Sequence, residues 1–282
     1  MNSTNELFLK ISNIFRSACL SELEALKPGN VHIFADGHGM VIEDFIKSAE
    51  ASSIAIAAEG LSVGERIYQA VKATHHAVGM NTNLGIVLLC APLVHAAYHK
   101  NKLDSFEETL MRILQHLTVA DAQLTAQAIL LANPAGLGNS AHGDVNNSPQ
   151  VTLLELMKIA QDRDRIAWQY ANTYADIFNF GLPLYQKALD KYQNEARATT
   201  ALYLGYLSNQ ADTHIVRKYG QAVAEEVMIE AQNFETIFWA TDNPKLIQHQ
   251  LLNWDLSLKN RQLNPGTCAD LTVATVFLKL IS

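Results

Sequence analysis

The chain has 282 residues, which is long enough for one large domain or two small ones. Hydrophobic residues make up 49% of it and charged residues 17%, so a sizeable core can be buried. The formal net charge is -7 and no cluster of Lys and Arg occurs, which excludes nucleic acid as a partner because phosphate contacts need clustered cations.

The same features set expectations for compartment and ligand. The longest apolar run, 84–94, is shorter than the roughly 20 residues that cross a bilayer, and no signal peptide is visible. The three cysteines, Cys19, Cys90 and Cys268, lie far apart without a C-x-x-C motif. We therefore expect a cytoplasmic protein without membrane contact, whose thiols are reduced and structural. An acidic protein is expected to hold a phosphorylated small molecule through a divalent cation.

Helix signals recur along the whole chain, and no segment has the pattern of a strand. Capping boxes begin at Ser62, Ser105 and Thr152, and looser versions that end in Asp begin at Thr118 and Thr267. The periodicity predicts about ten helices. Their spans are 4–25, 42–59, 63–78, 83–99, 106–117, 119–132, 153–179, 184–208, 213–239 and 244–281, and the last three are each expected to contain a break.

The span 83–99 is apolar on nearly every side up to His95. A helix that is hydrophobic all round belongs at the centre of a domain. Apolar helices on both sides of the loop 133–149 indicate a shared core. We therefore predict an all-α fold, with one domain over 1–282 built around the central helix 83–99.

One carboxylate stands on the apolar face of the first helix. The stripe that runs from Leu7 through Phe15 to Cys19, extended by one turn, places Glu22 on the buried side and Glu24 on the opposite side. A buried carboxylate must be paired, metal-bound or protonated. The alternative is a Glu at the edge of the core that reaches water.

Three turns rich in Asn, Pro and Gly connect helices and bring polar side chains together. The turn 27–32 (KPGNVH) places Lys27, Asn30 and His32 close to one another, although it could be an ordinary helix-terminating loop. The turns 133–138 and 264–266 repeat the theme, and glycine-rich turns that enter helices form anion sites.

The segment 80–85 opens the central helix in the same manner. Its polar residues Asn81, Thr82 and Asn83 either cap that helix or bind a ligand.

Two further polar groups stand out in the second half of the chain. Asp164 interrupts the apolar stripe of the span 153–179 far from either end, which excludes a capping role there and leaves an ion pair or a metal ion. Asp212 precedes His214, Arg217 and Lys218 on one helical turn, which suits a phosphate clamp but also an ordinary helix start. Common nucleotide and hydrolase motifs are absent.

Taken in order, these segments resemble the triphosphoribosyl-dephospho-CoA synthase family. The matching stretches cover nearly the whole chain: Glu22 with KPGNVH (27–32), DGHGM (36–40), NTNLG (81–85), ANPAGLG (132–138), DRDRIAWQYAN (162–172), DTHIVRKYG (212–220) and NPGTCADL (264–271). Each stretch is weak alone, and their order and spacing carry the resemblance.

The resemblance implies an all-α transferase that acts on ATP and dephospho-CoA. In that reaction the 2′-hydroxyl of dephospho-CoA attacks C1′ of the ribose of ATP, adenine leaves, and the product is a prosthetic-group precursor. The chemistry requires a carboxylate near an oxocarbenium-like centre, a proton donor for adenine, and Mg²⁺ with cations for the triphosphate.

The resemblance and the placement of the motifs together assign the site. Glu22 and Asp164 are the expected catalytic carboxylates and tentative Mg²⁺ ligands, and which of them is the base stays open. The polar residues of the other motifs are expected to bind substrate or phosphate: Lys27, Asn30, His32, His38, Asn81, Thr82, Asn83, Asp212, His214, Arg217, Lys218, Asn264, Gly266 and Asp270.

The chain departs from the family pattern at two places. Lyase-linked members tend to carry Asp where this chain has Gly39, and they tend to read N-T-H-K-G where it has Asn83 and Leu84. These departures favour a divergent branch, so a related phosphoribosyl-type transfer to another acceptor is the first alternative. A non-catalytic helical binding protein is the second.

Overall fold

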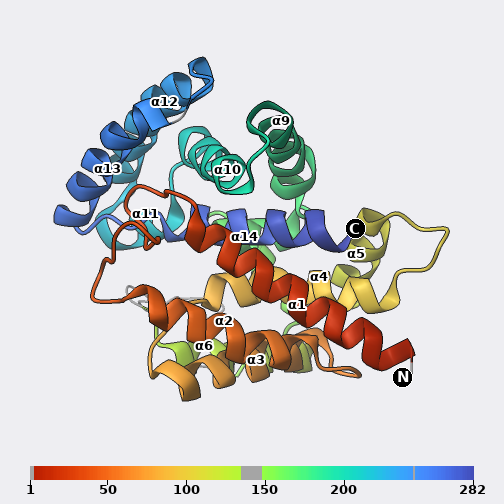
Figure 1. Cartoon of the computed structure of the whole chain (residues 1–282). Helices are drawn as coiled ribbons and strands as arrows, with labels where there is room; N and C mark the ends of the chain where they lie inside the picture. Colours follow the sequence, from red (N-terminus) through yellow and green to blue (C-terminus); the bar gives the residue numbers. More distant parts are fainter. Residues whose placement is uncertain (1–2, 135–147, 244) are drawn as a thin grey trace. The chain divides into compact units, whose positions relative to one another are not determined.

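The computed structural model describes residues 3–134, 148–243 and 245–282, and it confirms the all-α prediction (Figure 1). No sheet forms in these residues, and only two isolated bridges occur, His32–Ala35 and Gly37–Met40. The helices are α1 (Ser3–Glu24), α2 (Ile42–Ala57), α3 (Val63–Val78), α4 (Leu84–His99), α5 (Phe106–Gln115), α6 (Val119–Ala132), α7 (Leu153–Ala160), α8 (Arg165–Ala171), the π-helix η1 (Asp176–Gly181), α9 (Leu182–Tyr192), α10 (Glu195–Asn209), α11 (Thr213–Tyr219), α12 (Gln221–Ala240), α13 (Lys245–Asn260) and α14 (Gly266–Ile281).

The capping signals locate most helix starts. Ser62, Ser105, Thr118 and Thr152 all form reciprocal capping boxes with the acidic residue three positions later. The predicted box at Thr267 is wrong, because α14 already begins at Gly266. The hydroxyl of Thr267 instead forms a hydrogen bond of 3.0 Å with that of Thr213.

The breaks expected within 184–208, 213–239 and 244–281 are confirmed, because these spans divide into α9 and α10, α11 and α12, and α13 and α14. The prediction of one helix over 153–179 is wrong. That span divides into α7, α8 and η1. Asp164 leaves the helical conformation (φ -140, ψ 120) and its carboxylate caps α8. Thr173 and Tyr174 have φ values of 50 and 58, in the left-handed region, which ends α8 before η1 begins.

The chain divides into two compact units. The first unit comprises Met1–Ala18, Asp44–Ala175 and Phe277–Ser282, and the second comprises Cys19–Glu43 and Asp176–Val276. The expectation of a single domain over 1–282 stays a prediction.

In the first unit, α4 is buried on nearly every side, as predicted, and packs against α3, α5 and α8. Pro92 lies inside this helix and has no N–H, so the carbonyl of Leu88 lacks its helical donor. The hydroxyl of Tyr170 donates to that carbonyl at 2.6 Å. The side chain from α8 thereby satisfies a polar group that the proline would leave unpaired in the core.

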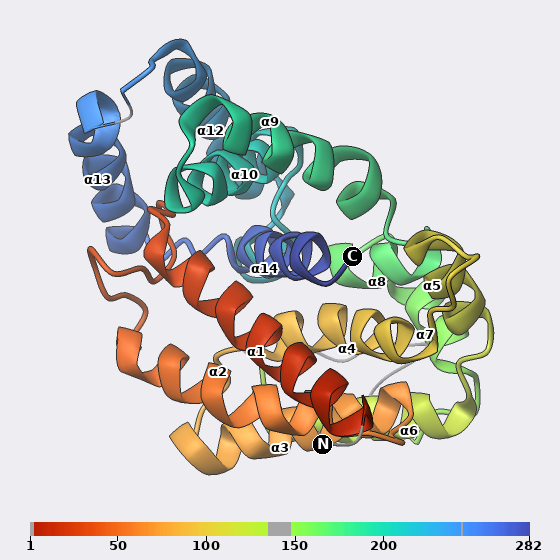
Figure 2. The same cartoon turned by 45° about the vertical axis from the view of Figure 1, so that its right-hand side comes forward.

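In the second unit, α10 takes the central position. Eleven of its residues, Ala198 through Ser208, are buried, and α9 and α12 pack beside it (Figure 2). Gly205 permits the contact with α9, because a Cβ there would lie 2.3 Å from Leu184 Cδ2. The buried helix supplies the rigid base for the polar loops described below.

The cysteines and the helix lengths agree with the composition. Cys19, Cys90 and Cys268 are free and buried. Within the described ranges, no helix is both long and apolar enough to cross a membrane.

Candidate active site

The turn 27–32 of the second unit has a conformation that only glycine tolerates at its centre. Gly29 has φ 84, and a Cβ there would lie 2.8 Å from Pro265 Cδ. Its N–H donates to Asp255 Oδ1 at 2.8 Å, and the hydroxyl of Tyr203 donates to the carbonyl of Pro28 at 2.7 Å. The turn is therefore held by α10 and α13 at once.

Glu22 and Lys27 form a buried ion pair inside this turn. Glu22 is 4% exposed and Lys27 is 0% exposed, so the alternative of a Glu that reaches water is wrong. Lys27 Nζ donates to Glu22 Oε1 and, at 2.9 Å, to Asn30 Oδ1. Burial raises the pKa of Glu22 and lowers that of Lys27, and the attraction between the two opposes both shifts. Each charge therefore depends on its partner.

Asn30 carries the network to the turn before α14. Its amide Nδ2 donates to Asn264 Oδ1 at 2.8 Å. Two of the predicted site motifs, 27–32 and 264–271, are thus joined through one pair of side-chain amides.

Asp255 and Lys259 of α13 belong to the same cluster, although the sequence analysis missed them. Lys259 Nζ donates to Asp255 Oδ2 at 2.9 Å and to the carbonyl of Ala35 at 3.0 Å. His32 Nε2 lies 3.4 Å from Asp255 Oδ1. Burial acts to raise the pKa of Asp255, but the contacts with His32 and Lys259 outweigh it and the pKa is lowered. The signal was available, because Asp255 follows Leu251 by four residues on the buried stripe of α13.

The loop 36–40 adds His38 to the cluster. This residue has φ 58, and its Nε2 lies 2.8 Å from the carbonyl oxygen of Gly29. Burial lowers the pKa of His38, and the charges of Lys218 and Lys259 act in the same direction. The neighbouring Gly39, where relatives tend to carry Asp, is exposed with φ 76 and has open space around its Cα.

Asp212 connects the N-termini of two helices. One carboxylate oxygen accepts the N–H groups of His214 and Ile215 at 2.8 and 3.2 Å, which caps α11. The other accepts the N–H of Cys268 at 2.8 Å, in the first turn of α14. The predicted cap is confirmed, and this second bond brings the motif 212–220 to the motif 264–271.

His214 stands beside this junction with a free ring nitrogen. Gly266 makes room for it, because a Cβ there would lie 2.7 Å from His214 Nδ1. His214 Nε2 is buried and has no hydrogen-bond partner among the described residues. Burial lowers its pKa to about 3, and the charges of Arg217, Lys218 and His38 contribute. The ring is therefore neutral at pH 7 and borders a positively charged surface.

Asp270 lies one turn further along α14 and is half-buried. Burial lowers the pKa of Lys27, and the negative charge of Asp270 opposes that shift. Burial also raises the pKa of the Cys19 thiol, and the charge of Asp270 adds to that shift. The second unit thus brings together eleven of the predicted site residues: Glu22, Lys27, Asn30, His32, His38, Asp212, His214, Arg217, Lys218, Asn264 and Gly266, with Asp270 beside them.

The predicted residues at the start of α4 belong to the first unit. Asn83 Oδ1 accepts the hydroxyl of Thr74 at 3.0 Å, and its Nδ2 donates to Ser52 Oγ at 3.0 Å. Thr82 donates to Ser48 Oγ at 2.6 Å, and Asn81 Oδ1 accepts the N–H of Leu84 at 3.2 Å. Asn83 and Thr82 thus form hydrogen bonds with α2 and α3, whereas Asn81 accepts the first N–H of α4; the N-cap residue itself, Asn83, makes no side-chain capping bond.

Asp164 also belongs to the first unit, and its interpretation as a residue within a helix is wrong. Its Oδ1 accepts the N–H groups of Ile166 and Ala167 at 2.9 and 3.1 Å. It is the N-cap of α8, the role that the sequence analysis had excluded. Of the motif 132–138, the residues 135–138 lie outside the described ranges.

No three His, Cys, Asp or Glu side chains in the described ranges form a group that could hold a metal ion. Glu22 is neutralised by Lys27 and Asp164 serves a helix end, so the donors present do not fit a metal site made by the protein alone.

Comparisons with known proteins identify the family and the fold. A solved structure from Archaeoglobus fulgidus, provisionally assigned as a triphosphoribosyl-dephospho-CoA synthase, is 24% identical in sequence, with a TM-score of 0.65 over 83% of this chain and 96% of that one. It shares the fold. No curated protein matches the chain. The sequence model of the CitG family, ATP:dephospho-CoA triphosphoribosyl transferase, matches residues 8–282. The chain belongs to this family of transferases.

Proposed function

We propose that the cluster of the second unit is the active site in which the triphosphoribosyl group of ATP is transferred to the 2′-hydroxyl of dephospho-CoA. The family match supports the reaction. One observation supports the location: the segments 27–38, 212–218 and 264–270 converge there, beside His214 Nε2, which has no hydrogen-bond partner among the residues that the structure describes.

The transfer exchanges one bond for another at C1′ of the ribose. The bond from C1′ to N9 of adenine breaks, and a bond from C1′ to the 2′-oxygen of the acceptor forms. The acceptor hydroxyl loses a proton and the departing adenine gains one. A side chain that can accept the proton of the acceptor hydroxyl, or donate one to adenine, would therefore speed the reaction.

His214 is the candidate for proton transfer. Its pKa of about 3 in the free protein reflects burial and the neighbouring cations. A bound triphosphate would neutralise the charges of Arg217 and Lys218, which raises the pKa of His214 and makes it a better base. The binding of the donor thereby prepares His214 Nε2 to accept the proton of the acceptor hydroxyl.

The cations of the cluster serve the triphosphate. Arg217 and Lys218 are exposed on α11, and the first turn of α14 adds the positive end of a helix dipole. Lys27 is fully buried between Glu22 and Asn30, so its contribution is to hold the turn and keep Glu22 ionised. Glu22 stays the candidate carboxylate for the oxocarbenium-like centre.

Mg²⁺ enters this proposal with the substrate. Mg²⁺ usually keeps several waters and binds through one or two carboxylates plus substrate phosphates. When bound on ATP, the ion neutralises part of the triphosphate charge.

Adenine release tests the proposal. The purified protein is incubated with ATP, Mg²⁺ and dephospho-CoA, adenine is quantified, and the acceptor is analysed by mass. One adenine for each triphosphoribosylated dephospho-CoA is the expected result. If ATP raises the melting temperature but no adenine forms, the proposed acceptor is wrong. If ATP does not bind either, the chain has no transferase activity and a binding role replaces it.

A different acceptor is the second candidate, and one observation favours it. Leu84, at the position where relatives tend to carry Lys, is 9% exposed and begins α4. A buried leucine cannot replace a lysine contact to phosphate, so this candidate requires the turn 81–84 to contact the substrate, in contrast to the location proposed above. Adenine release that requires a compound other than dephospho-CoA would establish this candidate.

A further inference from the structure

A second cavity of the second unit combines an apolar floor with two cations. It has a volume of about 270 Å³ and lies between α10, α12, α13 and the segment 24–34. Its floor consists of Leu26, Phe238 and Leu251, which are 6%, 2% and 1% exposed. Phe34, 48% exposed, stands at the rim.

Arg197 and Lys245 line this cavity and have no carboxylate partner. Their backbone N–H groups bond to Asn194 and Asn243, but neither side chain forms an ion pair or hydrogen bond within the ranges that the structure describes. Three other cations of the second unit do have a carboxylate partner: Lys191 pairs with Asp242, Lys259 with Asp255, and Arg261 with Glu230. The cavity therefore carries a net positive charge that no described protein group neutralises.

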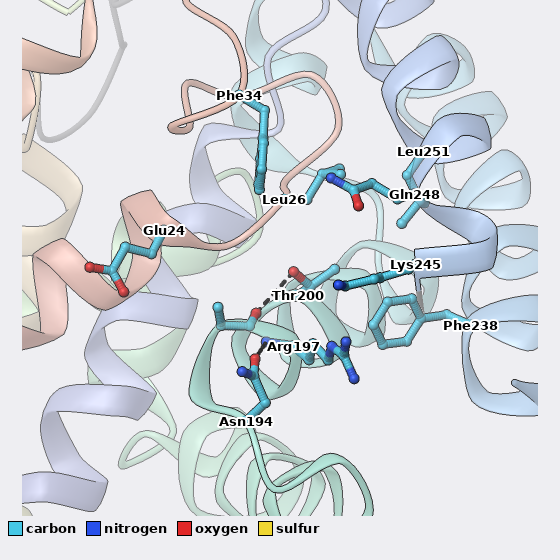
Figure 3. A pocket seen from close by; sticks show the side chains of 11 residues that line it. Glu24, Leu26, Phe34, Asn194, Arg197, Thr200, Phe238, Lys245, Gln248 and Leu251 are labelled. Carbon is cyan, nitrogen blue, oxygen red and sulfur yellow. Dashed lines mark hydrogen bonds between the residues drawn. The ribbon is translucent and has the colours of Figure 1, made fainter. Parts of the chain in front are cut away.

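Both cations face the cavity, Arg197 as a half-buried side chain and Lys245 as an exposed one. Figure 3 shows Arg197 and Lys245 extending into the same space beside Phe238. Glu24 is the one acidic residue of the lining, and its carboxylate points away from both cations. Arg197 lies in the first turn of α10, where the helix dipole adds positive partial charge.

The cavity and the active site share one segment of chain. Leu26 and Phe34 line the cavity, whereas Lys27 and His32 belong to the cluster. The rings of Phe34 and His32 lie 5.8 Å apart, and the Phe34 N–H donates to His32 Nδ1 at 3.3 Å. A ligand that extends from the cluster past this segment would reach the cavity.

We propose that this cavity binds the diphosphate and the pantetheine arm of the acceptor, an inference that rests on the proposed function. The diphosphate supplies the anion for Arg197 and Lys245. The arm carries a branched apolar segment for the floor and amides that can bond with the side chain of Gln248 in the wall. The adenosine end, with its 2′-hydroxyl, then faces the cluster. ATP has no such arm, so the cavity distinguishes the acceptor from the donor.

Calorimetric titration with 4′-phosphopantetheine tests the cavity without turnover. The wild-type protein is expected to bind it. The double variant Arg197→Gln/Lys245→Gln should lose at least about tenfold in affinity, because charge-assisted hydrogen bonds to phosphate disappear. Lys187→Gln, an exposed lysine of α9 outside the cavity lining, is the matched control and should bind as the wild type does.

Steady-state kinetics supply the second readout. The double variant should raise the KM for dephospho-CoA by about tenfold and leave the KM for ATP unchanged. Phe34→Ala should weaken phosphopantetheine but not inorganic pyrophosphate. If the wild type does not bind phosphopantetheine, if the KM for ATP rises equally, or if pyrophosphate binds as tightly as phosphopantetheine, the inference is wrong.

The two proposals fail separately. If the wild type releases no adenine, the proposed reaction is wrong, and the titration still decides whether the cavity takes a phosphopantetheine group. If adenine is released normally while phosphopantetheine does not bind, the proposed reaction is confirmed and the assignment of the cavity is wrong.

Discussion

Two polar regions of this molecule are built from the same kinds of side chain but differ in what they leave unbonded. In the first unit, Asn81, Thr82 and Asn83 direct their polar groups to neighbours on α2, α3 and α4. In the second unit, the amides of Asn30 and Asn264 bond to each other and join two turns, while His214 Nε2 stays without a partner in the described ranges.

The difference separates a network that holds helices together from one that prepares a surface for a ligand. A buried polar atom without a partner is costly, typically about 1 to 3 kcal/mol, and a ligand bound beside His214 would offset that cost. In the second region, Glu22 and Lys27 form a buried ion pair, and the charges of Arg217 and Lys218 on α11 act on His214. The following changes test this contrast, from the largest expected effect to the smallest.

Removal of Lys27 should have the largest effect, and it acts on stability. Lys27→Met leaves Glu22 buried with its charge uncompensated, and we expect a loss of about 3 to 5 kcal/mol in the free energy of unfolding, measured in urea. The double variant Glu22→Gln/Lys27→Met removes both charges and should recover most of that loss. A single variant that loses less than about 1 kcal/mol would show that water reaches the pair.

Replacement of His214 should act on the reaction instead. His214→Gln removes the proposed proton acceptor, and kcat/KM should fall about 100-fold while the unfolding free energy at pH 7 changes little. His249→Gln, an exposed histidine of α13 in the same unit, is the control and should have full activity. Equal activity of the two variants would remove His214 from the mechanism.

The same histidine predicts how stability depends on pH. Its pKa is about 3 in the folded protein, against about 6.5 for an unperturbed histidine, so the unfolded chain binds the proton more readily between these values. Stability should therefore be highest above pH 6.5 and fall as the pH drops toward 3. The decline should be shallower in His214→Gln, measured by urea unfolding across that range. An identical decline in both proteins would contradict the burial of this ring.

Truncation of Asn83 tests the opposite region. Asn83→Ala removes two buried hydrogen bonds and should lower the unfolding free energy by about 1 to 3 kcal/mol. Asn81→Ala removes one partly exposed bond and should cost less, about 0.5 to 1 kcal/mol. In both variants, the kcat/KM of the folded fraction should equal that of the wild-type protein. A loss of kcat/KM that exceeds the loss of stability would place this turn in the substrate site as well.

The sequence could predict helices and caps because those signals are local. Four capping boxes and the buried helix α4 follow from spacing alone. Glu22 could be recognised as buried because α1 continues through it and keeps its stripe in register. Asp255 lies on the buried stripe of α13 in the same way, so the same periodicity predicts its burial.

The long-range contacts could not be predicted in this way. Asp212 accepts the N–H of Cys268, 56 positions away, and Gly29 donates to Asp255, 226 positions away. The free nitrogen of His214 depends on the close approach of Gly266, which no periodicity encodes. The family resemblance predicted one site from all of the motifs, and the structure shows the bonds that join those of 27–32, 212–220 and 264–271 within the second unit.

Asp164 is the point at which the local argument misled, and it gives the smallest expected effect. The apolar residues of 153–179 match one helical period, but a carboxylate that can accept two N–H groups begins a new helix instead. Asp164→Ala should therefore cost about 1 kcal/mol of unfolding free energy, and Asp164→Asn, which retains an acceptor, close to nothing. Both should release adenine at the wild-type rate. If Asp164→Asn folds normally but loses activity, the carboxylate has a role in the reaction that its cap does not explain, and the family-based assignment of Asp164 regains its support.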